Sequence, residues 1–348
     1  MNHEITVSND ALGFADALYN QGQSEFGKLI VAETVAKRMF LAGLAMGDSN
    51  ILLIGEPGGG KSTLIENATR IIQGIDEADV AFVPHRADLT AAELVGDSAR
   101  SVKTVDDGNG NITREVLTAE LESMIHPNVQ AVIFDEINRA NPYALNAALN
   151  ILAQRKMTVD GKSVPMNKLE LVASSMNAGE TLTASFKLTA ALASRQTMGA
   201  ILGAGSVAER NMIQDKIWDD DWESTPQDVN SVISLQQLHV VRAAIPKVVM
   251  SDNMRSEGKR VSLRTRDALR DRDALRDPTT TDILVKESDG RIATKLKRLT
   301  KTLALLRGRT SAEEQDLKDA VDYTVTGRLG LRGADAADIQ QVVDSIYR

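Results

Sequence analysis

The glycine-rich segment ILLIGEPGGGKST, residues 51–63, constrains this 348-residue chain more than any other feature of its sequence. Its first part, Ile51–Ile54, is a short apolar run typical of a buried strand, and a helical pattern begins at about Ser62. The segment from the end of this strand to the start of the helix contains the four fixed residues of the phosphate-binding loop G-x-x-x-x-G-K-[ST]. They are Gly55, Gly60, Lys61 and Ser62. This strand–loop–helix pattern predicts a nucleoside triphosphate site.

The residue types in this loop suit the chemistry of phosphate binding. Glycines allow successive backbone N–H groups to converge on phosphate oxygens, and the following helix adds its positive N-terminal end. Lys61 is expected to reach the β- and γ-phosphates, and the Ser62 hydroxyl is expected to bind Mg²⁺. We therefore predict ATP and Mg²⁺ as cofactors. The predicted nucleotide-binding residues are Gly55, Glu56, Pro57, Gly58, Gly59, Gly60, Lys61, Ser62 and Thr63.

An apolar run that ends in two carboxylates, residues 131–136, is predicted to complete the site. Next to the strand that leads into the phosphate loop, Asp135 can join Ser62 in holding Mg²⁺, through the metal's water shell. Glu136 can orient and polarise the water that attacks the γ-phosphorus. Asn177, which ends a third run, LELVASSMN, can detect the γ-phosphate; a turn-forming asparagine before Ala-Gly is the alternative.

Phosphoryl transfer also needs positive charge, and two arginines are candidates for supplying it. Arg195 follows a helical stretch, LTAALAS, and in a ring it could reach the nucleotide of a neighbouring subunit. Arg291 begins a late amphipathic helix and could contact the γ-phosphate from a lid. The residues alone leave open that either one is an ordinary surface arginine.

Strand-like and helical patterns alternate over roughly the first 205 residues. Such alternation implies parallel pairing in a doubly wound α/β sheet. Further strands are predicted at Val80–Val83, Ala131–Phe134, Leu169–Ala173 and Met198–Leu202. Helices are predicted at 28–47, 62–73, 118–125 and 143–154. From about Ser206 onward the pattern is mainly helical, with a clear amphipathic helix at Ile292–Arg307.

Four other segments stand out by their turn signals or charge. Ser101–Val116 and Lys156–Val164 contain Asp-Gly or Asn-Gly pairs and are predicted to be hairpins, either ordinary surface hairpins or client-contacting surfaces. The segment WDDDWE, Trp218–Glu223, is interpreted as a solvated loop or helix start. The tandem RDALRD repeat, residues 266–277, is either a charged helix that Pro278 ends or a mobile excursion.

The stretch AVIFDEINRANPYALNAALNILAQRKMTVDGKSV, residues 131–164, resembles the core of the AAA+ ATPases, and within them the MoxR-type family. DLTAAELVGD upstream, and LTAALASR and RIATKLKRLTKTLALLRGR downstream, resemble further parts of that family. The resemblance implies a P-loop core with sheet order 5-1-4-3-2 and a smaller, all-helical C-terminal lid. It also implies that Arg195 is the arginine finger and Arg291 the second sensor, and that both hairpins lie near a central pore.

The same resemblance gives the domain limits and the partners. Residues 1–27 would be an N-terminal extension, 28–205 the nucleotide-binding core with hairpin insertions near 101–116 and 156–164, and 206–348 the lid with a charged insertion near 254–288. It implies a homo-oligomeric ring, usually a hexamer, that binds nucleotide between subunits. Relatives commonly act with a partner that carries a von Willebrand factor A domain, remodelling a complex or helping to insert a cofactor or metal.

Composition excludes several other classes of function. The chain has no cysteine, so it has no disulfide or thiolate metal site, which fits a cytoplasmic protein. A net charge of −8 and an aromatic content of 3% argue against broad attraction to nucleic acid or anionic membrane. Its apolar runs are too short to cross a bilayer, and the first residues lack the pattern of a signal peptide.

The sequence thus predicts an ATPase that acts as a ring chaperone on a protein client. One alternative is a nucleic-acid motor of helicase-like or restriction-associated type, since Lys103, Arg114, Lys156 and Lys162 in the two hairpins could line a basic pore. Another is a scaffold that assembles on nucleotide without turnover. The complete set of Lys61, Asp135 and Glu136 argues against the scaffold.

Overall fold

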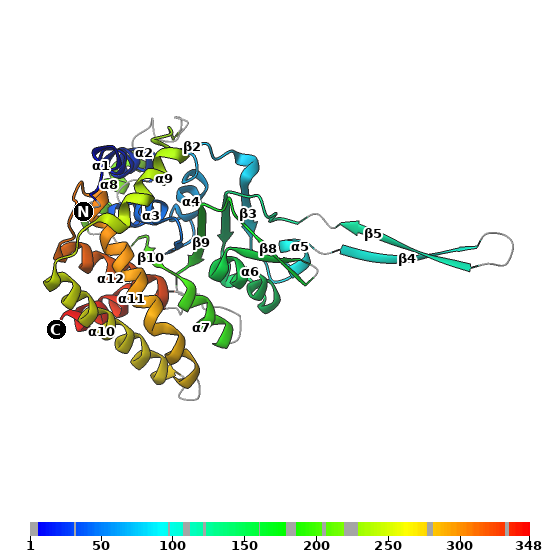
Figure 1. Ribbon diagram of the computed structural model, residues 1–348. Helices are drawn as coiled ribbons and strands as arrows, with labels where there is room; N and C mark the ends of the chain where they lie inside the picture. The colour runs from blue at the N-terminus through cyan, green and yellow to red at the C-terminus, as the bar shows by residue number, and fades with distance from the viewer. Residues whose placement is uncertain are drawn as a thin grey trace, which may run out of the picture.

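A computed structural model gives the structure of the chain (Figure 1). It describes residues 6–30, 33–96, 98–106, 112–120, 123–159, 161–178, 186–203, 207–218, 229–276, 281–330 and 334–348.

The centre of the molecule is a five-stranded sheet in which every pairing is parallel. Its strands are β1 (Asn50–Gly55), β3 (Val80–Pro84), β6 (Ala131–Asp135), β9 (Leu171–Asn177) and β10 (Met198–Ile201), in the order β10-β1-β9-β6-β3. Counting these strands along the chain gives 5-1-4-3-2, so the predicted fold class and sheet order are confirmed. In such a sheet all five carboxyl ends lie at one edge, where ligands bind.

Helices cover both faces of this sheet, so the central strands β1 and β9 are buried at every position rather than at every second one. In β1, Ile51 and Leu53 pack into one hydrophobic cluster while Leu52 and Ile54 pack into the other. The second cluster includes residues of α5 (Ala91–Val95), α6 (Pro142–Gln154) and α7 (Phe186–Arg195). The first includes residues of α3 (Thr34–Met46), α4 (Lys61–Asn67) and the C-terminal helices.

The C-terminal part is almost entirely helical, as the sequence indicated. Its elements are α8 (Val207–Ile217), β11 (Ile233–Ser234), α9 (Leu235–Ala244), η4 (Ile245–Lys247), α10 (Asp252–Arg276), α11 (Thr281–Leu306), α12 (Glu314–Gly330) and α13 (Ala336–Tyr347). The RDALRD repeat is helical through Arg276, and Pro278 lies outside the described residues. Trp218 is 83% exposed, and the rest of the WDDDWE segment is likewise outside them.

The lid is joined to the sheet by a very close approach of backbones. A Cβ placed on Gly327 of α12 would lie 2.6 Å from the carbonyl carbon of Met198, and one on Gly199 would lie 2.6 Å from the Cα of Gly327. Glycine is therefore required where α12 crosses β10. This contact fixes the lid against one side of the sheet.

The segment before the sheet is also structured. It forms α1 (Asn9–Asp16), a π-helical turn η1 (Ala17–Gln21) and α2 (Gly22–Leu29), which the sequence analysis did not anticipate. Ala11, Ala15, Leu18 and Phe26 are buried in the same cluster as the lid and α3. Residues 9–29 thus pack into the same hydrophobic core as α3 and the C-terminal helices.

Several predicted elements are wrong in their limits or type. The helix predicted over 28–47 is broken, because α2 ends at Leu29 and α3 begins at Thr34 after Glu33 at φ 52°. The helix predicted over 62–73 stops at Asn67, since residues 72–73 form strand β2, which pairs with β11. Residues 112–120 form β5, not the start of a helix at Thr118. In each case pairing or packing with distant residues overrides the local pattern.

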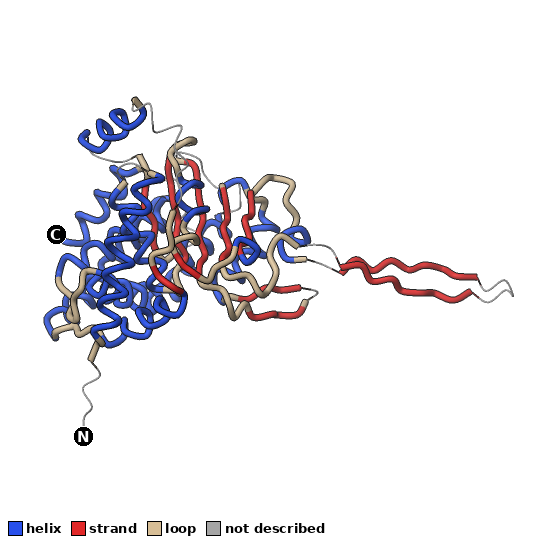
Figure 2. Tube along the Cα trace, turned by 90° about the horizontal axis from the view of Figure 1, so that it is seen from above, coloured by secondary structure: helices blue, strands red, loops and turns tan. Residues whose placement is uncertain are grey.

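Both predicted hairpins are present, and they lie toward the same end of the molecule (Figures 1 and 2). β4 (Ser98–Asp106) and β5 (Ile112–Glu120) pair antiparallel and project well away from the body, a longer hairpin than the predicted 101–116. β7 (Lys156–Val159) and β8 (Lys162–Pro165) form the shorter one, beside α5 and α6. Among the described residues, no helix is both long enough and apolar enough to cross a membrane.

The close contact at Gly327 predicts a large cost for one added methyl group. Gly327→Ala should lower the free energy of unfolding by at least about 1–3 kcal/mol, because the methyl meets backbone that cannot move aside. Urea unfolding measures this. Gly13→Ala in α1 is the control, since its Cβ would meet nothing within 4 Å and alanine favours a helix. Equal stability of Gly327→Ala and the wild type would contradict the close packing.

Candidate nucleotide-binding site

The phosphate loop connects the carboxyl end of β1 to the start of α4, as predicted. Gly58 and Gly60 adopt the left-handed region, at φ 79° and 78°, where a side chain would be strained. The Gly59 N–H donates to the Glu56 carbonyl at 3.1 Å, which closes the turn. Gly60 stands at the N-cap of α4, so the loop delivers its backbone directly to a helix N-terminus.

Lys61 extends back across this loop instead of pointing into solvent. Its residue is 6% exposed, and its Nζ donates to the carbonyl oxygens of Gly55 and Glu56, each at 2.7 Å. The ammonium group is thereby held inside the curve of the loop. This is where a fixed cation can bind the terminal phosphates of a nucleotide.

The Mg²⁺ residues predicted from sequence meet in the structure. The Ser62 hydroxyl donates to Asp135 Oδ1 at 3.2 Å, across a sequence separation of 73 residues. Asp135 ends β6, and the Ser175 hydroxyl of β9 also donates to the same carboxylate oxygen. Hydroxyl and carboxylate oxygens are the hard ligands that Mg²⁺ prefers. Burial and, second, the negative charge of Asp135 raise the pKa of Glu66, one turn further along α4, and Arg70 opposes the shift.

This donor set fits Mg²⁺ better than a metal enclosed by protein. Among the described residues there is no group of three or more His, Asp or Glu side chains placed to hold a metal ion. Mg²⁺ usually keeps several waters and is bound by one or two protein oxygens together with substrate phosphates. Ser62 and Asp135 are therefore the residues that would hold it.

Glu136 and Asn177 lie together at the same edge of the sheet. The Asn177 Nδ2 donates to Glu136 Oε1 at 3.0 Å, and Arg139 forms an ion pair with Glu136 Oε2 at 2.9 Å. In the β1–β9 register Asn177 is the partner of Gly55, the first residue of the phosphate loop. A buried amide, 2% exposed, thus connects the carboxylate to the loop. This arrangement can report the state of the terminal phosphate to Glu136.

The backbone of Glu136 is itself unusual. It adopts φ 49°, a left-handed conformation that is costly for a residue with a side chain, about 1–3 kcal/mol. The Ser175 hydroxyl accepts a hydrogen bond from its N–H at 2.8 Å and so supports this conformation. The turn directs the Glu136 side chain to Asn177 and Arg139 as soon as β6 ends.

Sequence reasoning missed Ser175 and Arg139. Ser175 lies in LELVASSMN, in a strand that is buried throughout, and a buried hydroxyl needs a hydrogen-bond partner. The adjacent serines Ser174 and Ser175 in an otherwise apolar run were the available signal, and the sequence does not say which of the two finds a partner. Arg139, three residues after Glu136, lies in the short 3-10 turn η3 (Ile137–Arg139), and no sequence pattern distinguished it.

Arg195 and Arg291 lie at the other edge of the sheet. The Arg195 carbonyl accepts a hydrogen bond at 2.7 Å from Asn50, the first residue of β1, whereas the phosphate loop follows the last. A six-residue strand separates these points by roughly 20 Å. Arg291 is an exposed residue of α11, and Lys295 one turn later donates to the same carbonyl at 3.1 Å. The structure brings the two arginines toward each other and neither of them to the phosphate loop of their own chain.

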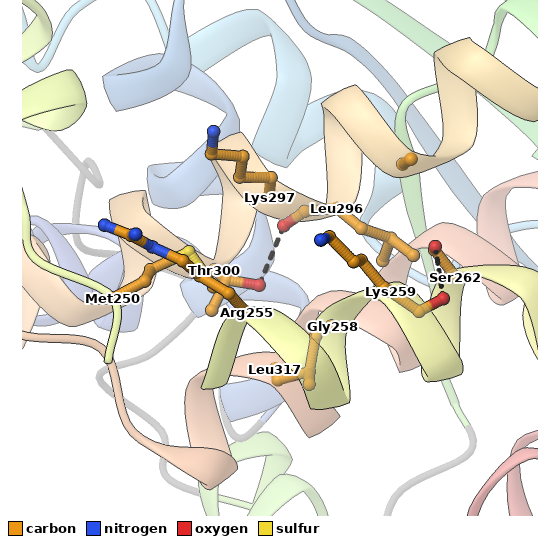
Figure 3. A pocket seen from close by; sticks show the side chains of 10 residues that line it. Met250, Arg255, Gly258, Lys259, Ser262, Leu296, Lys297, Thr300 and Leu317 are labelled. Carbon is orange, nitrogen blue, oxygen red and sulfur yellow. Dashed lines mark hydrogen bonds between the residues drawn. The ribbon is translucent and has the colours of Figure 1, made fainter. Parts of the chain in front are cut away.

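The lid has a separate pocket of about 200 Å³ between α10 and α11 (Figure 3). Its lining contains aliphatic side chains, including Leu296, and the cationic residues Arg255, Lys259 and Lys297. None of its lining residues belongs to the phosphate loop or to the central strands. It is therefore distinct from the nucleotide site.

Comparisons with known proteins agree with this geometry. Residues 50–196 match the family model of the AAA domain, dynein-related subfamily. Over 153 residues the chain is 26% identical to Chaperone MoxR1 of Mycobacterium tuberculosis, an alignment that covers 44% of this chain and 36% of that protein. Residues 50–196 are thus similar to an AAA domain, and the chain is similar in part to a MoxR-type chaperone.

A solved structure shows the same overall fold. It comes from Cytophaga hutchinsonii, is described as that of a candidate ATPase, and superposes with a TM-score of 0.66 at 17% identity. The match covers 97% of this chain and 96% of the other. The sequence alignment with the curated chaperone spans only about a third of that protein's length.

Ser175 and its neighbour provide a matched test of the site. Ser175→Ala removes the hydroxyl that contacts both Asp135 and the Glu136 N–H, and we expect Mg²⁺-dependent turnover to fall about 10- to 100-fold. Ser174→Ala is the control, because its buried hydroxyl has no hydrogen-bond partner. Phosphate release measured against Mg²⁺ concentration separates the two. Equal loss in both variants would show a general packing effect.

Lys295 gives a pH-dependent prediction. Burial, followed by the charges of Arg328 and Arg155, lowers its pKa from 10.5 to about 7, and Asp48 opposes the shift. Between these two pH values the unfolded chain binds more protons than the folded chain, so stability rises with pH. The free energy of unfolding of the wild type should therefore increase relative to Lys295→Met from pH 7 toward pH 10. A constant difference over that range would show that Lys295 is not shifted.

Proposed function

We propose that this chain hydrolyses ATP with Mg²⁺ and acts as a MoxR-type AAA+ chaperone that remodels or matures a partner protein. One observation carries the proposal. Two parallel strands bring Asp135, Glu136 and Asn177 to the edge of the sheet where β1 enters the phosphate loop. Binding, metal-holding and water-activating groups therefore converge at one place.

Each residue has a distinct part in this mechanism. The loop amides and Lys61 bind and orient the phosphates, and Ser62 with Asp135 would hold Mg²⁺, which offsets phosphate charge when it is bound. Glu136 accepts a proton from the attacking water while Asn177 and Arg139 hold its two carboxylate oxygens in place. Asn177 also contacts the loop strand, so loss of the γ-phosphate can change its hydrogen bond to Glu136.

From the sequence, Arg195 is assigned to the nucleotide of a neighbouring subunit and Arg291 to the γ-phosphate from the lid. Arg195 lies at the opposite edge of the sheet from the phosphate loop of its own chain, and Arg291 lies one turn before Lys295, which contacts the Arg195 carbonyl. We infer that both arginines act on the nucleotide of a neighbouring copy. This supports assembly into a homo-oligomeric ring, for which we propose a hexamer, with turnover that depends on protein concentration. The chaperone resemblance also supports a cytoplasmic location and a partner that carries a von Willebrand factor A domain.

The projecting hairpin favours a protein client over nucleic acid. The described residues of β4 and β5 contain three basic residues, Arg100, Lys103 and Arg114, and three acidic residues, Asp106, Glu115 and Glu120. Their charges cancel, and the register places Lys103 opposite Glu115. A hairpin without net charge gives little attraction to a phosphate backbone.

Replacing the catalytic carboxylate tests the proposal. Glu136→Gln should bind ATP with normal affinity and assemble, but turn over at least about 100-fold more slowly, because the amide cannot accept the proton. Steady-state phosphate release and nucleotide binding measure the two effects, with Glu77→Gln, whose side chain is 86% exposed, as the control. Turnover by Glu136→Gln at the wild-type rate would refute the assignment, and DNA-stimulated turnover would favour the motor.

A further inference from the structure

The C-terminal end of α7, which carries Arg195, accepts hydrogen bonds from two lid helices. Arg328 of α12 donates to the Ser194 carbonyl at 3.3 Å. Lys295 of α11 donates to the Arg195 carbonyl at 3.1 Å and to the Thr197 hydroxyl at 2.8 Å. The last turn of α7 is therefore capped from the lid, which lies more than ninety residues further along the chain.

The core contributes one further donor to the same turn. Asn50, at the start of β1, donates to the carbonyls of both Leu152 in α6 and Arg195 in α7. Asn50 is 2% exposed and belongs to the rigid sheet. The Arg195 carbonyl thus accepts hydrogen bonds from Asn50 of the sheet and from Lys295 of the lid. Cations near a helix C-terminus are favourable because the carbonyl dipoles end there.

Neither lid cation forms an ion pair with a carboxylate of the described residues, and Arg328 is buried while Lys295 is half-buried. Arg328 is 4% exposed, its Nε has no hydrogen-bond partner, and no carboxylate of the described chain forms an ion pair with it. Burial and the charge of Arg291 lower its pKa to about 10. Asp48, the nearby acid that acts on Lys295, is itself paired with Arg298 at 2.8 Å.

A buried cation without a counter-charge is unfavourable, because burial removes the water that solvates it. Here the carbonyl ends of α7 supply the attraction, while repulsion among Arg291, Lys295 and Arg328 opposes it. Such an opposed contact contributes little net stability, yet it fixes where the last turn of α7 lies. It is a means of positioning rather than a source of stability.

We propose that Arg328 and Lys295 are positioning residues that hold the α7 terminus, from which Arg195 can reach the nucleotide of the neighbouring copy by releasing the hydrogen bond that its Nη1 donates to the Ala191 carbonyl at 2.8 Å. The proposal rests on the proposed function, because it takes Arg195 to complete a site between subunits. The position of the lid would then determine the position of Arg195. A lid that shifts with the nucleotide bound to its own chain would move Arg195 and so change the rate of turnover in the neighbouring subunit.

The test is a double-substitution cycle on the full-length protein. Arg328→Gln should lower kcat for ATP about 10- to 100-fold with KM nearly unchanged, since a displaced group loses positioning rather than binding. Adding Arg328→Gln to Arg195→Ala should cause no further loss of kcat, because Arg328 affects turnover only by positioning Arg195. Arg328→Lys, which can still donate to Ser194, should recover most of the rate. A further loss in the double variant equal to that of Arg328→Gln alone would overturn the proposal.

Mixing variants shows where the defect acts. Lys61→Ala alone lacks a working phosphate loop but keeps the α7 terminus intact. In a mixture of Lys61→Ala with Arg328→Gln, the first variant supplies an intact α7 terminus and the second supplies an intact phosphate loop, so turnover should return at interfaces between the two. A mixture of Lys61→Ala with Arg195→Ala should regain turnover in the same way. Rescue of Arg195→Ala but not of Arg328→Gln would refute positioning of Arg195. Wild-type turnover by Arg195→Ala, by contrast, would refute the proposed function itself.

Lys295→Met provides a second variant in case Arg328→Gln folds poorly. It removes the other lid donor and should show the same pattern, a lower kcat and no added effect on Arg195→Ala. The matched control is Lys297→Met, an exposed residue two positions later on α11, which should keep wild-type turnover. Thermal unfolding should show that Arg328→Gln is no less stable than the wild type, because a buried unpaired charge is removed. A large loss of stability would instead indicate a structural role.

Discussion

The pairing of β9 between β1 and β6 is the constraint on which the rest of the structure depends. Its register places Asn177 beside Gly55 and brings Ser175 to Asp135 and Glu136. A shift of one residue in register would move every side chain of β9 to the opposite face of the sheet and separate the loop from its carboxylates. Core packing therefore sets the geometry of the nucleotide site. Ser175 connects them, because it is a buried residue of β9 whose hydroxyl contacts both Asp135 and the Glu136 N–H.

The sheet has two chemically different edges. At the carboxyl ends of the strands lie Lys61, Asp135 and Glu136, a site suited to phosphate and a divalent cation. At the amino end of β1 lie Asn50, Arg155 and the end of α7, where helix termini and cations gather. Burial lowers the pKa of Arg155 to about 10, and its guanidinium donates to Asn50 Oδ1 and the Ser49 carbonyl. In a ring, the second edge of one copy would face the first edge of the next.

The lid helix α12 contacts residues near both edges of the sheet. Gly327 lets α12 lie directly on β10, and Gly330 further along α12 approaches Ile54 near the end of β1. Arg328, between these glycines, reaches the end of α7. One helix thus extends from the end of α7 toward the phosphate-loop side of the sheet. This arrangement gives a physical route by which the position of the lid and that of Arg195 can depend on each other.

The sequence by itself determined the phosphate loop, the strand ending in Asp135 and Glu136, and the sheet order, because these follow from short local patterns and a family resemblance. It failed at residues 28–47 and 112–120, where contacts with distant segments decided the helix start and the strand. Only the tertiary structure decided that Ser175 and Arg139 support the carboxylates and that Arg195 and Arg291 lie far from the loop. Those facts depend on strand register and on how the lid packs, and neither is encoded within a local stretch of sequence.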